Sequence, residues 1–163
     1  MATKAIPDGY HSAIPHLTVR NAAKAIEYYK KAFGAKERMR MPTPDGRIGH
    51  AELEIGDSVI FLADEAPNMG ASKSPETLGG CTGGVMLYVE DVDTTFKKAV
   101  DAGGKAFMPV ADMFWGDRFG SLVDPFGHVW SIATHKEDVA PAEMEKRAQD
   151  FYASMARQQK KTA

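Results

Sequence analysis

The chain repeats one sequence pattern at a spacing of about seventy residues. That shift places residues 16–19 (HLTV) on residues 86–89 (MLYV). It also aligns three further pairs: Asn21 with Asp91, Gly34 with Gly104, and Phe61 with Ser131. Because one shift matches a strand, a helix start, a helix stop and a later strand, the sequence predicts an internal duplication.

The first copy predicts a strand, a helix and three further strands. Residues 12–19 alternate between apolar and polar side chains, which is typical of a half-buried strand. Asn21 is a suitable N-cap for a helix that ends at Gly34. Strands over 50–55 and 58–63 flank Gly56-Asp57, a two-residue hairpin loop that sets Glu52 opposite Phe61.

The second copy repeats this scheme and is followed by another helix. A strand over 85–89 leads to a helix that Asp91 caps and Gly103-Gly104 ends. A strand over 105–110, a loop around Trp115 and a hairpin turned by residues 124–127 complete the copy. A last helix is expected to start near Pro141. Its apolar stripe has two interpretations: it packs on the body or across a dimer, or it docks another protein.

The predicted fold class is α+β. We expect two βαβββ modules from internal duplication, each with a mixed sheet, plus a C-terminal helix. The expected domain spans residues 10–138, with module 1 at about 10–64, a linker at 65–83 and module 2 at about 84–138. Residues 139–163 form the C-terminal helix and tail. The linker is interpreted as a plain connection or as a lid over a pocket.

Bulk composition excludes several classes of function. A formal net charge of −2 gives no electrostatic reason to bind nucleic acid or membrane. No apolar run reaches the roughly 18 residues of a membrane span, and no signal peptide is visible. The single cysteine, Cys81, fits a reducing compartment, so we expect a cytoplasmic protein. Neither Cys81 nor His128 is assigned any chemistry, because their sequence context shows no sign of activation.

Four segments together resemble a known superfamily: AIPHLTVRNAAKAIEYYKKAFGA, GHAELEIGDSVIFLADE, LYVEDVD and WGDRFGSLVDPFGHVWSIATHKED. They are similar to the vicinal oxygen chelate superfamily of glyoxalases, bleomycin-resistance proteins and extradiol dioxygenases. Within it, the small PhnB-like, glyoxalase-related branch is most similar. The resemblance covers Tyr10 to Asp138.

This resemblance implies paired βαβββ modules that enclose a cup, commonly completed or flanked by a homodimer. In metal-using members, His, Glu or Gln ligands come from the first and last strand of each module. The matching positions here are Ile14, Phe61, Gly84 and Ser131. These residues do not supply the imidazole or carboxylate ligands that a catalytic divalent metal needs. We therefore expect no metal and no other cofactor, and the resemblance argues against glyoxalase I or extradiol dioxygenase activity.

Other polar residues still offer a site. His16, His50 and Glu52 share one predicted face and form either a displaced metal site, an acid–base pair or ordinary polar positions. Arg118 has two interpretations. It binds an anionic ligand bidentately beside Trp115, or it forms an ion pair with Asp117. Phe61, Met86, Tyr88 and Phe119 are expected to face one cavity. The predicted ligand-binding residues are His16, Glu52, Phe61, Met86, Tyr88, Trp115, Arg118 and Phe119.

Three functions remain open. The first is metal-independent binding or sequestration of a hydrophobic or aromatic small molecule, as in bleomycin resistance. The second is a glyoxalase-like enzyme that uses a displaced metal or a His/Glu acid–base pair, with His16, His50 and Glu52 as catalytic candidates. The third is a protein whose cup is filled by side chains and which acts through its C-terminal helix. A small-molecule ligand and a second copy of the chain are the expected partners.

Overall fold

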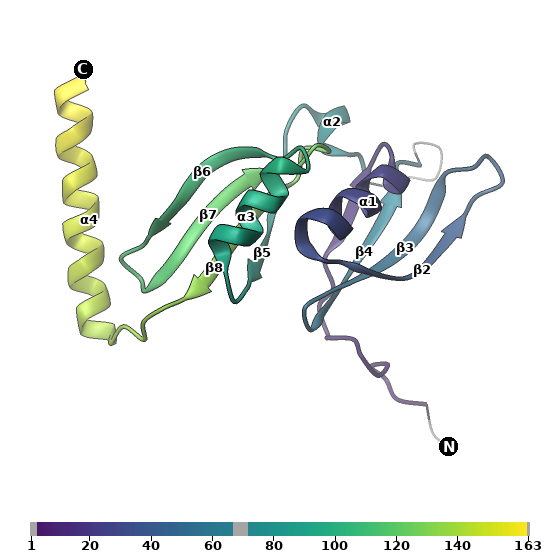
Figure 1. Ribbon diagram of the computed structural model, residues 1–163, viewed down its shortest axis with the longest axis horizontal. Coiled ribbons are helices and arrows are strands. Elements are labelled where there is room, and N and C mark those ends of the chain that lie inside the picture. Colours follow the sequence, from purple (N-terminus) through teal and green to yellow (C-terminus); the bar gives the residue numbers. More distant parts are fainter. Residues whose placement is uncertain (1–2, 67–71, 163) are drawn as a thin grey trace.

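Two βαβββ modules lie side by side in the computed structural model, which describes residues 3–66 and 72–162 (Figure 1). The elements of module 1 are β1 (His16–Val19), α1 (Ala22–Phe33), β2 (Lys36–Pro42), β3 (Ile48–Ile55) and β4 (Ser58–Asp64). A short helix α2 (Pro75–Leu78) follows. The elements of module 2 are β5 (Gly84–Tyr88), α3 (Val92–Asp101), β6 (Lys105–Asp112), β7 (Asp117–Val123) and β8 (Val129–His135). Helix α4 (Pro141–Thr162) ends the chain.

The two sheets have the same topology. Their strand orders are β1-β4-β3-β2 and β5-β8-β7-β6, and in each the first strand pairs in parallel with the last. The other pairings are antiparallel. Glu52 lies opposite Phe61, as the two-residue hairpin loop predicts. The α+β class and the duplication are therefore confirmed.

The duplication extends to the hydrogen bonds that begin each helix. The side chains of Asn21 and Asp91 accept the N–H groups three residues ahead, which satisfies donors that have no partner inside the helix. The last strand of each module adds a second acceptor. Asp64 accepts the N–H of Ala22, and Thr134 accepts that of Val92.

A shared aromatic core joins the modules on the helix side of the sheets. Trp130 of β8 is fully buried against two rings of α1, with ring centroids 5.2 Å from Tyr29 and 4.4 Å from Phe33. The buried carboxylate of Asp124 accepts hydrogen bonds from Tyr29 and Trp130. Burial, followed by this carboxylate, raises the pKa of Tyr29 well above its usual value. The tyrosine therefore stays a hydrogen-bond donor across the module junction.

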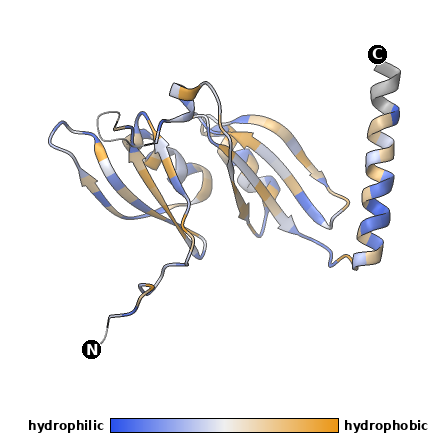
Figure 2. Ribbon diagram, turned by 180° about the vertical axis from the view of Figure 1, so that it is seen from behind, coloured by the Kyte–Doolittle hydropathy of each residue, from blue (hydrophilic) through white to orange (hydrophobic). Residues whose placement is uncertain are grey.

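Because α1 and α3 lie on the same side, no helix among the described residues covers the opposite face of either sheet. Figure 2 shows these two open faces from behind. The first strand begins at His16, whereas the alternating pattern predicts a start at Ser12. The parallel register with β4 starts with His16 opposite Phe61, and the carbonyl oxygen of Pro15 accepts the N–H of Phe61.

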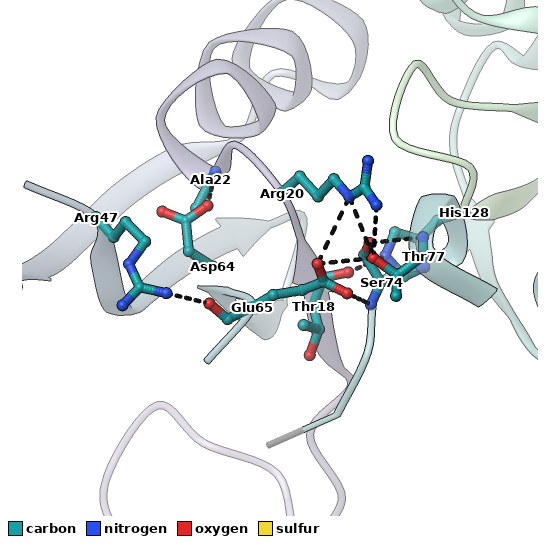
Figure 3. Close-up of polar contacts among 9 residues, drawn as sticks. All are labelled: Thr18, Arg20, Ala22, Arg47, Asp64, Glu65, Ser74, Thr77 and His128. Atoms are coloured by element: carbon teal, nitrogen blue, oxygen red, sulfur yellow. Dashed lines mark hydrogen bonds and ion pairs between the residues drawn. The ribbon is translucent and has the colours of Figure 1, made fainter. Parts of the chain in front are cut away.

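The predicted linker contains a short helix, α2, which is not predicted from the sequence. Ser74 is fully buried and caps α2, and Pro75 occupies its first turn. Glu65, just after β4, accepts hydrogen bonds from the backbone of Ser74 and the hydroxyl of Thr77 (Figure 3). Part of the predicted linker, residues 67–71, lies outside the described residues.

Helix α4 begins at Pro141, as predicted, and stands beside module 2 (Figure 1). Its contact with the body includes Phe151, whose ring centroid lies 5.1 Å from that of Phe114. Arg147 also pairs with Glu137, just ahead of the helix. Among the described residues, no helix has the length and apolar character needed to span a membrane.

Candidate functional site on the open faces of the sheets

Each open face carries one cluster of polar and aromatic side chains. The Glu52 cluster lies on module 1 and consists of Tyr10, His16, Arg38, His50, Glu52 and Phe61. The Asp117 cluster lies on module 2 and consists of Tyr88, Trp115, Asp117, Phe119 and His135.

Strand alternation brings the Glu52 cluster together. His16 on β1, Phe61 on β4 and His50 on β3 point to the same side, because Phe61 pairs with both His16 and Glu52. The ring centroids of His50 and Phe61 are 4.8 Å apart, and those of His16 and His50 are 6.4 Å apart. His50 Nε2 lies 3.4 Å from Glu52 Oε1. The three predicted catalytic candidates therefore share one surface.

Glu52 is nearly buried because the N-terminal segment covers it. The Tyr10 hydroxyl donates to Glu52 Oε2 at 2.5 Å, and the Arg38 guanidinium lies 4.5 Å above the Tyr10 ring. The hydrogen bond to Glu52 raises the pKa of Tyr10, so the phenol stays protonated. Burial, followed by the neighbouring His50, lowers the pKa of His16, which favours a neutral imidazole.

In the Asp117 cluster, three donors surround one buried carboxylate. Tyr88 Oη lies 2.9 Å and Trp115 Nε1 lies 3.1 Å from Asp117 Oδ2. His135 Nδ1 lies 2.8 Å from Oδ1. Burial opposes ionisation, but hydrogen bonds from His135, Tyr88 and Trp115 outweigh it and lower the pKa of the Asp117 carboxyl.

The Asp117 carboxylate also acts on its neighbours. His135 donates a hydrogen bond to Asp117 and a second one to Asp138, and these two acceptors raise the pKa of the imidazole. The carboxylate holds the Trp115 ring edge-on to Phe119, with centroids 5.7 Å apart. Tyr88 is 60% exposed. The cluster therefore presents aromatic rings to solvent while the polar atoms of Tyr88 and Trp115 stay hydrogen-bonded to Asp117.

Arg118 does not join either cluster. It pairs bidentately with Asp93 of α3 and also contacts Asp112, on the helix side of the sheet. The alternative that Arg118 pairs with Asp117 is wrong, because Asp117 faces the opposite side and is held by Tyr88, Trp115 and His135. Neighbouring residues of a strand point to opposite faces.

The expected shared cavity is divided in two within the chain. Glu52 and Phe61 line a cavity of about 370 Å³ together with Tyr10 and Ile14. Met86 and Tyr88 line another, of about 520 Å³, along the free edge of β5. Its other lining residues are His11, Ala13, Pro15, residues 55–60, Val85, Leu87 and Trp130.

The residues at the family's metal positions do not fit a metal. Phe61 lines its cavity beside Ile14, and Ser131 pairs with Met86. Gly84 has no side chain, and a methyl group there would already lie 3.0 Å from the carbonyl oxygen of Val129. Among the described residues, no three His, Cys, Asp or Glu side chains are arranged to hold a metal ion.

Sequence reasoning missed Tyr10 and His135. Tyr10 lies 42 residues before Glu52 and outside any predicted element, so no local pattern pairs them. The position of His135 does carry a signal in the sequence. It follows β8 residues Ser131 and Ala133 at period two and therefore lies on the open face.

Comparison with known proteins assigns the chain to a family. The model of the Glyoxalase/Bleomycin resistance protein/Dioxygenase superfamily matches residues 11–132, well over half of the chain. The chain belongs to this superfamily. The resemblance drawn from the sequence motifs is therefore confirmed, and the two clusters occupy the open faces of a superfamily member.

Similar proteins span most of the chain. The uncharacterized protein Rv0887c of Mycobacterium tuberculosis is 44% identical over 127 residues, covering 77% of this chain and 75% of that protein. Protein YjdN of Escherichia coli is 29% identical over 140 residues, covering 72% of this chain and 90% of that protein. The crystal structure of TioX from Micromonospora sp. ML1 is 27% identical with a TM-score of 0.60, covering 77% and 99% of the two chains. A PhnB protein from Bacillus cereus, 18% identical with a TM-score of 0.59, shares the fold.

Proposed function

We propose that this superfamily member binds a hydrophobic or aromatic small molecule on its open faces without a metal. The observation that carries the proposal is the Asp117 cluster. A buried carboxylate fixes Tyr88 and Trp115, and Trp115 stands against Phe119, on the open face of module 2. Aromatic walls around a few oriented polar groups are typical of small-molecule sites.

Three further observations support the binding proposal. The donor set at the family positions lacks imidazole and carboxylate groups, so a ligand must be held by other contacts. The Glu52 cluster adds a carboxylate and two imidazoles beside Phe61 for polar contacts. Met86 is 43% exposed and extends the apolar surface of module 2.

We further propose that a second copy of the chain completes the site. The accessible surface is 10570 Å², whereas a typical monomer of 17.7 kDa has about 8,000 Å². An excess of roughly 2,600 Å² per chain is about 5,200 Å² for two chains, at the upper end of the range that obligate homodimers bury. Each open face would then be covered by the partner, which supplies the closed walls that a single chain lacks.

The rival function is acid–base catalysis at Glu52. It is favoured by one observation: Tyr10, His50 and Glu52 form a connected set of proton donors and acceptors beside an aromatic ring. In this mechanism Glu52 takes a proton from a bound substrate and His50 orients the carboxylate. Tyr10 must first leave Glu52 Oε2, because the phenol occupies the oxygen that a substrate would approach.

A titration with the fluorescent aromatic sulfonate 8-anilinonaphthalene-1-sulfonate tests the binding proposal. We expect saturable binding of one probe per chain that survives excess EDTA, on a protein whose mass by light scattering is twice that of the chain. Trp115→Ala is expected to weaken binding about tenfold, equivalent to about 1.4 kcal/mol. Phe107→Ala is the matched control, because Phe107 is 72% exposed and belongs to neither cluster. Equal losses in both variants, or release by EDTA, would contradict the proposal.

A further inference from the structure

Cys81 and His128 form a thiol–imidazole pair at the junction of the modules, outside both clusters. Cys81 lies in the segment before β5, and His128 lies in the turn before β8. Folding brings Cys81 Sγ to 3.9 Å from His128 Nδ1, within reach of a hydrogen bond to sulfur. A nucleophile and a base at this separation are the first requirement for an activated thiol.

A hydrogen bond across the junction fixes which nitrogen of His128 carries the proton. Nε2 lies 3.1 Å from the carbonyl oxygen of Thr18 on β1 (Figure 3). A carbonyl oxygen only accepts, so Nε2 must carry the hydrogen. In the neutral ring Nδ1 is then a free base, and it faces the sulfur of Cys81. His128 is only 9% exposed, so its ring is held in this orientation.

The pair borders a cavity that a small molecule can enter. The cavity has a volume of about 290 Å³, and both Cys81 and His128 line it. Its other walls are Pro15, His16, Leu17, Gly83, Gly84, Val85 and Val129. The sulfur also lies 2.9 Å from the carbonyl oxygen of Gly83, which accepts the single thiol hydrogen and holds the half-buried sulfur at the cavity wall. Rotation about the Cβ–Sγ bond turns this hydrogen from Gly83 towards Nδ1 of His128.

We propose that Cys81 is a nucleophilic thiol that bonds covalently to a small α,β-unsaturated carbonyl compound, with His128 as its base. The thiol proton passes to Nδ1 of His128, and the thiolate attacks the β-carbon of the electrophile. A carbon–sulfur bond forms while the electron pair of the double bond moves to the α-carbon. The imidazolium then returns its proton to the α-carbon, which yields a thioether and a neutral His128.

The proposed reaction uses neither the Glu52 carboxylate nor the Asp117 cluster, although His16 of the Glu52 cluster also lines the cavity. Two other titratable groups border the pair. His16 lines the same cavity, and the carboxylate of Asp124 accepts the backbone N–H of His128. Neither group lies between the sulfur and Nδ1, so the proton transfer runs directly from Cys81 to His128.

The test measures the rate of acrylamide addition to the full chain by intact mass spectrometry at pH 6.5 and pH 9. An unassisted thiol with a pKa of about 8.5 is only about 1% thiolate at pH 6.5. We expect the wild-type protein to react at least about tenfold faster than His128→Gln at pH 6.5, and the two rates to converge at pH 9. The glutamine keeps a donor for the carbonyl of Thr18 but has no basic nitrogen. Cys81→Ser must show no addition.

A second comparison covers the case in which His128→Gln does not fold. The wild-type chain unfolded in urea presents the same thiol without its base, so the folded protein must react about tenfold faster at pH 6.5. Equal rates for folded and unfolded chains would overturn the proposal. A wild-type to variant ratio that is the same at both pH values would do so too, because it indicates a change of access rather than the loss of a base.

Discussion

Replacing Asp124 with alanine is expected to lower the free energy of unfolding by about 3–5 kcal/mol. The Asp124 carboxylate is 4% exposed and accepts four hydrogen bonds. The donors are Tyr29 Oη, Trp130 Nε1 and the backbone N–H groups of Phe126 and His128. Each buried donor left without an acceptor costs roughly 1–3 kcal/mol, and water entering the space offsets part of the sum.

Urea unfolding followed by circular dichroism measures this effect. Asp45→Ala is the matched control, because Asp45 is exposed and pairs with Arg47 at the surface. Exposed ion pairs contribute at most about 1 kcal/mol, so the control should change stability little. Tyr29→Phe removes one of the four donors and should fall between the two. If Asp124→Ala and Asp45→Ala cost the same, Asp124 does not hold the modules together.

Replacing Gly116 with alanine is the second change with a large expected effect. Gly116 has φ of +96°, and a Cβ there would lie 2.2 Å from the carbonyl oxygen of Glu137. The carbonyl of Gly116 also accepts the N–H groups of Lys136 and Glu137, so the clash displaces the segment that follows β8. The strained backbone costs about 1–2 kcal/mol and the overpacking about 1–3 kcal/mol more.

We expect Gly116→Ala to lower Tm by about 10 °C, whereas the control Gly46→Ala lowers it by about 4 °C. Gly46 has a similar φ of +83°, but a methyl group at this position would have no atom within 4 Å. The difference between the variants therefore isolates the clash with Glu137. Equal shifts in Tm would show that the segment after β8 moves aside without cost.

Most of the fold can be predicted from local sequence patterns that occur in both modules. Asn21 and Asp91 mark helix starts, and Gly56-Asp57 sets the register that puts Glu52 opposite Phe61. Helix α2 escapes prediction although Ser74-Pro75 is a helix-start signal, because the surrounding composition is typical of a loop. The packing of α1 against module 2 depends on contacts such as Tyr29 with Asp124, which no periodicity contains.

The candidate site is only partly predictable, because some of its contacts also join segments that no local pattern connects. Strand alternation places His16, His50 and Glu52 on one face, and the structure brings them together. The same rule shows that Arg118 and Phe119 cannot share a face, so grouping them in one site conflicts with strand geometry. Tyr10 covers Glu52 from a segment without regular structure, and sequence spacing gives no means to foresee that contact.

The most direct test of the central claim is the metal content of the purified protein before and after incubation with nickel, zinc and manganese. We expect elemental analysis to find close to zero metal per chain in each case, because the family positions hold Ile14, Phe61, Gly84 and Ser131. Uptake of about one equivalent that Glu52→Gln abolishes would contradict it. Glu52, His50 and His16 would then form a displaced metal site, and the metal-independent binding function would be wrong.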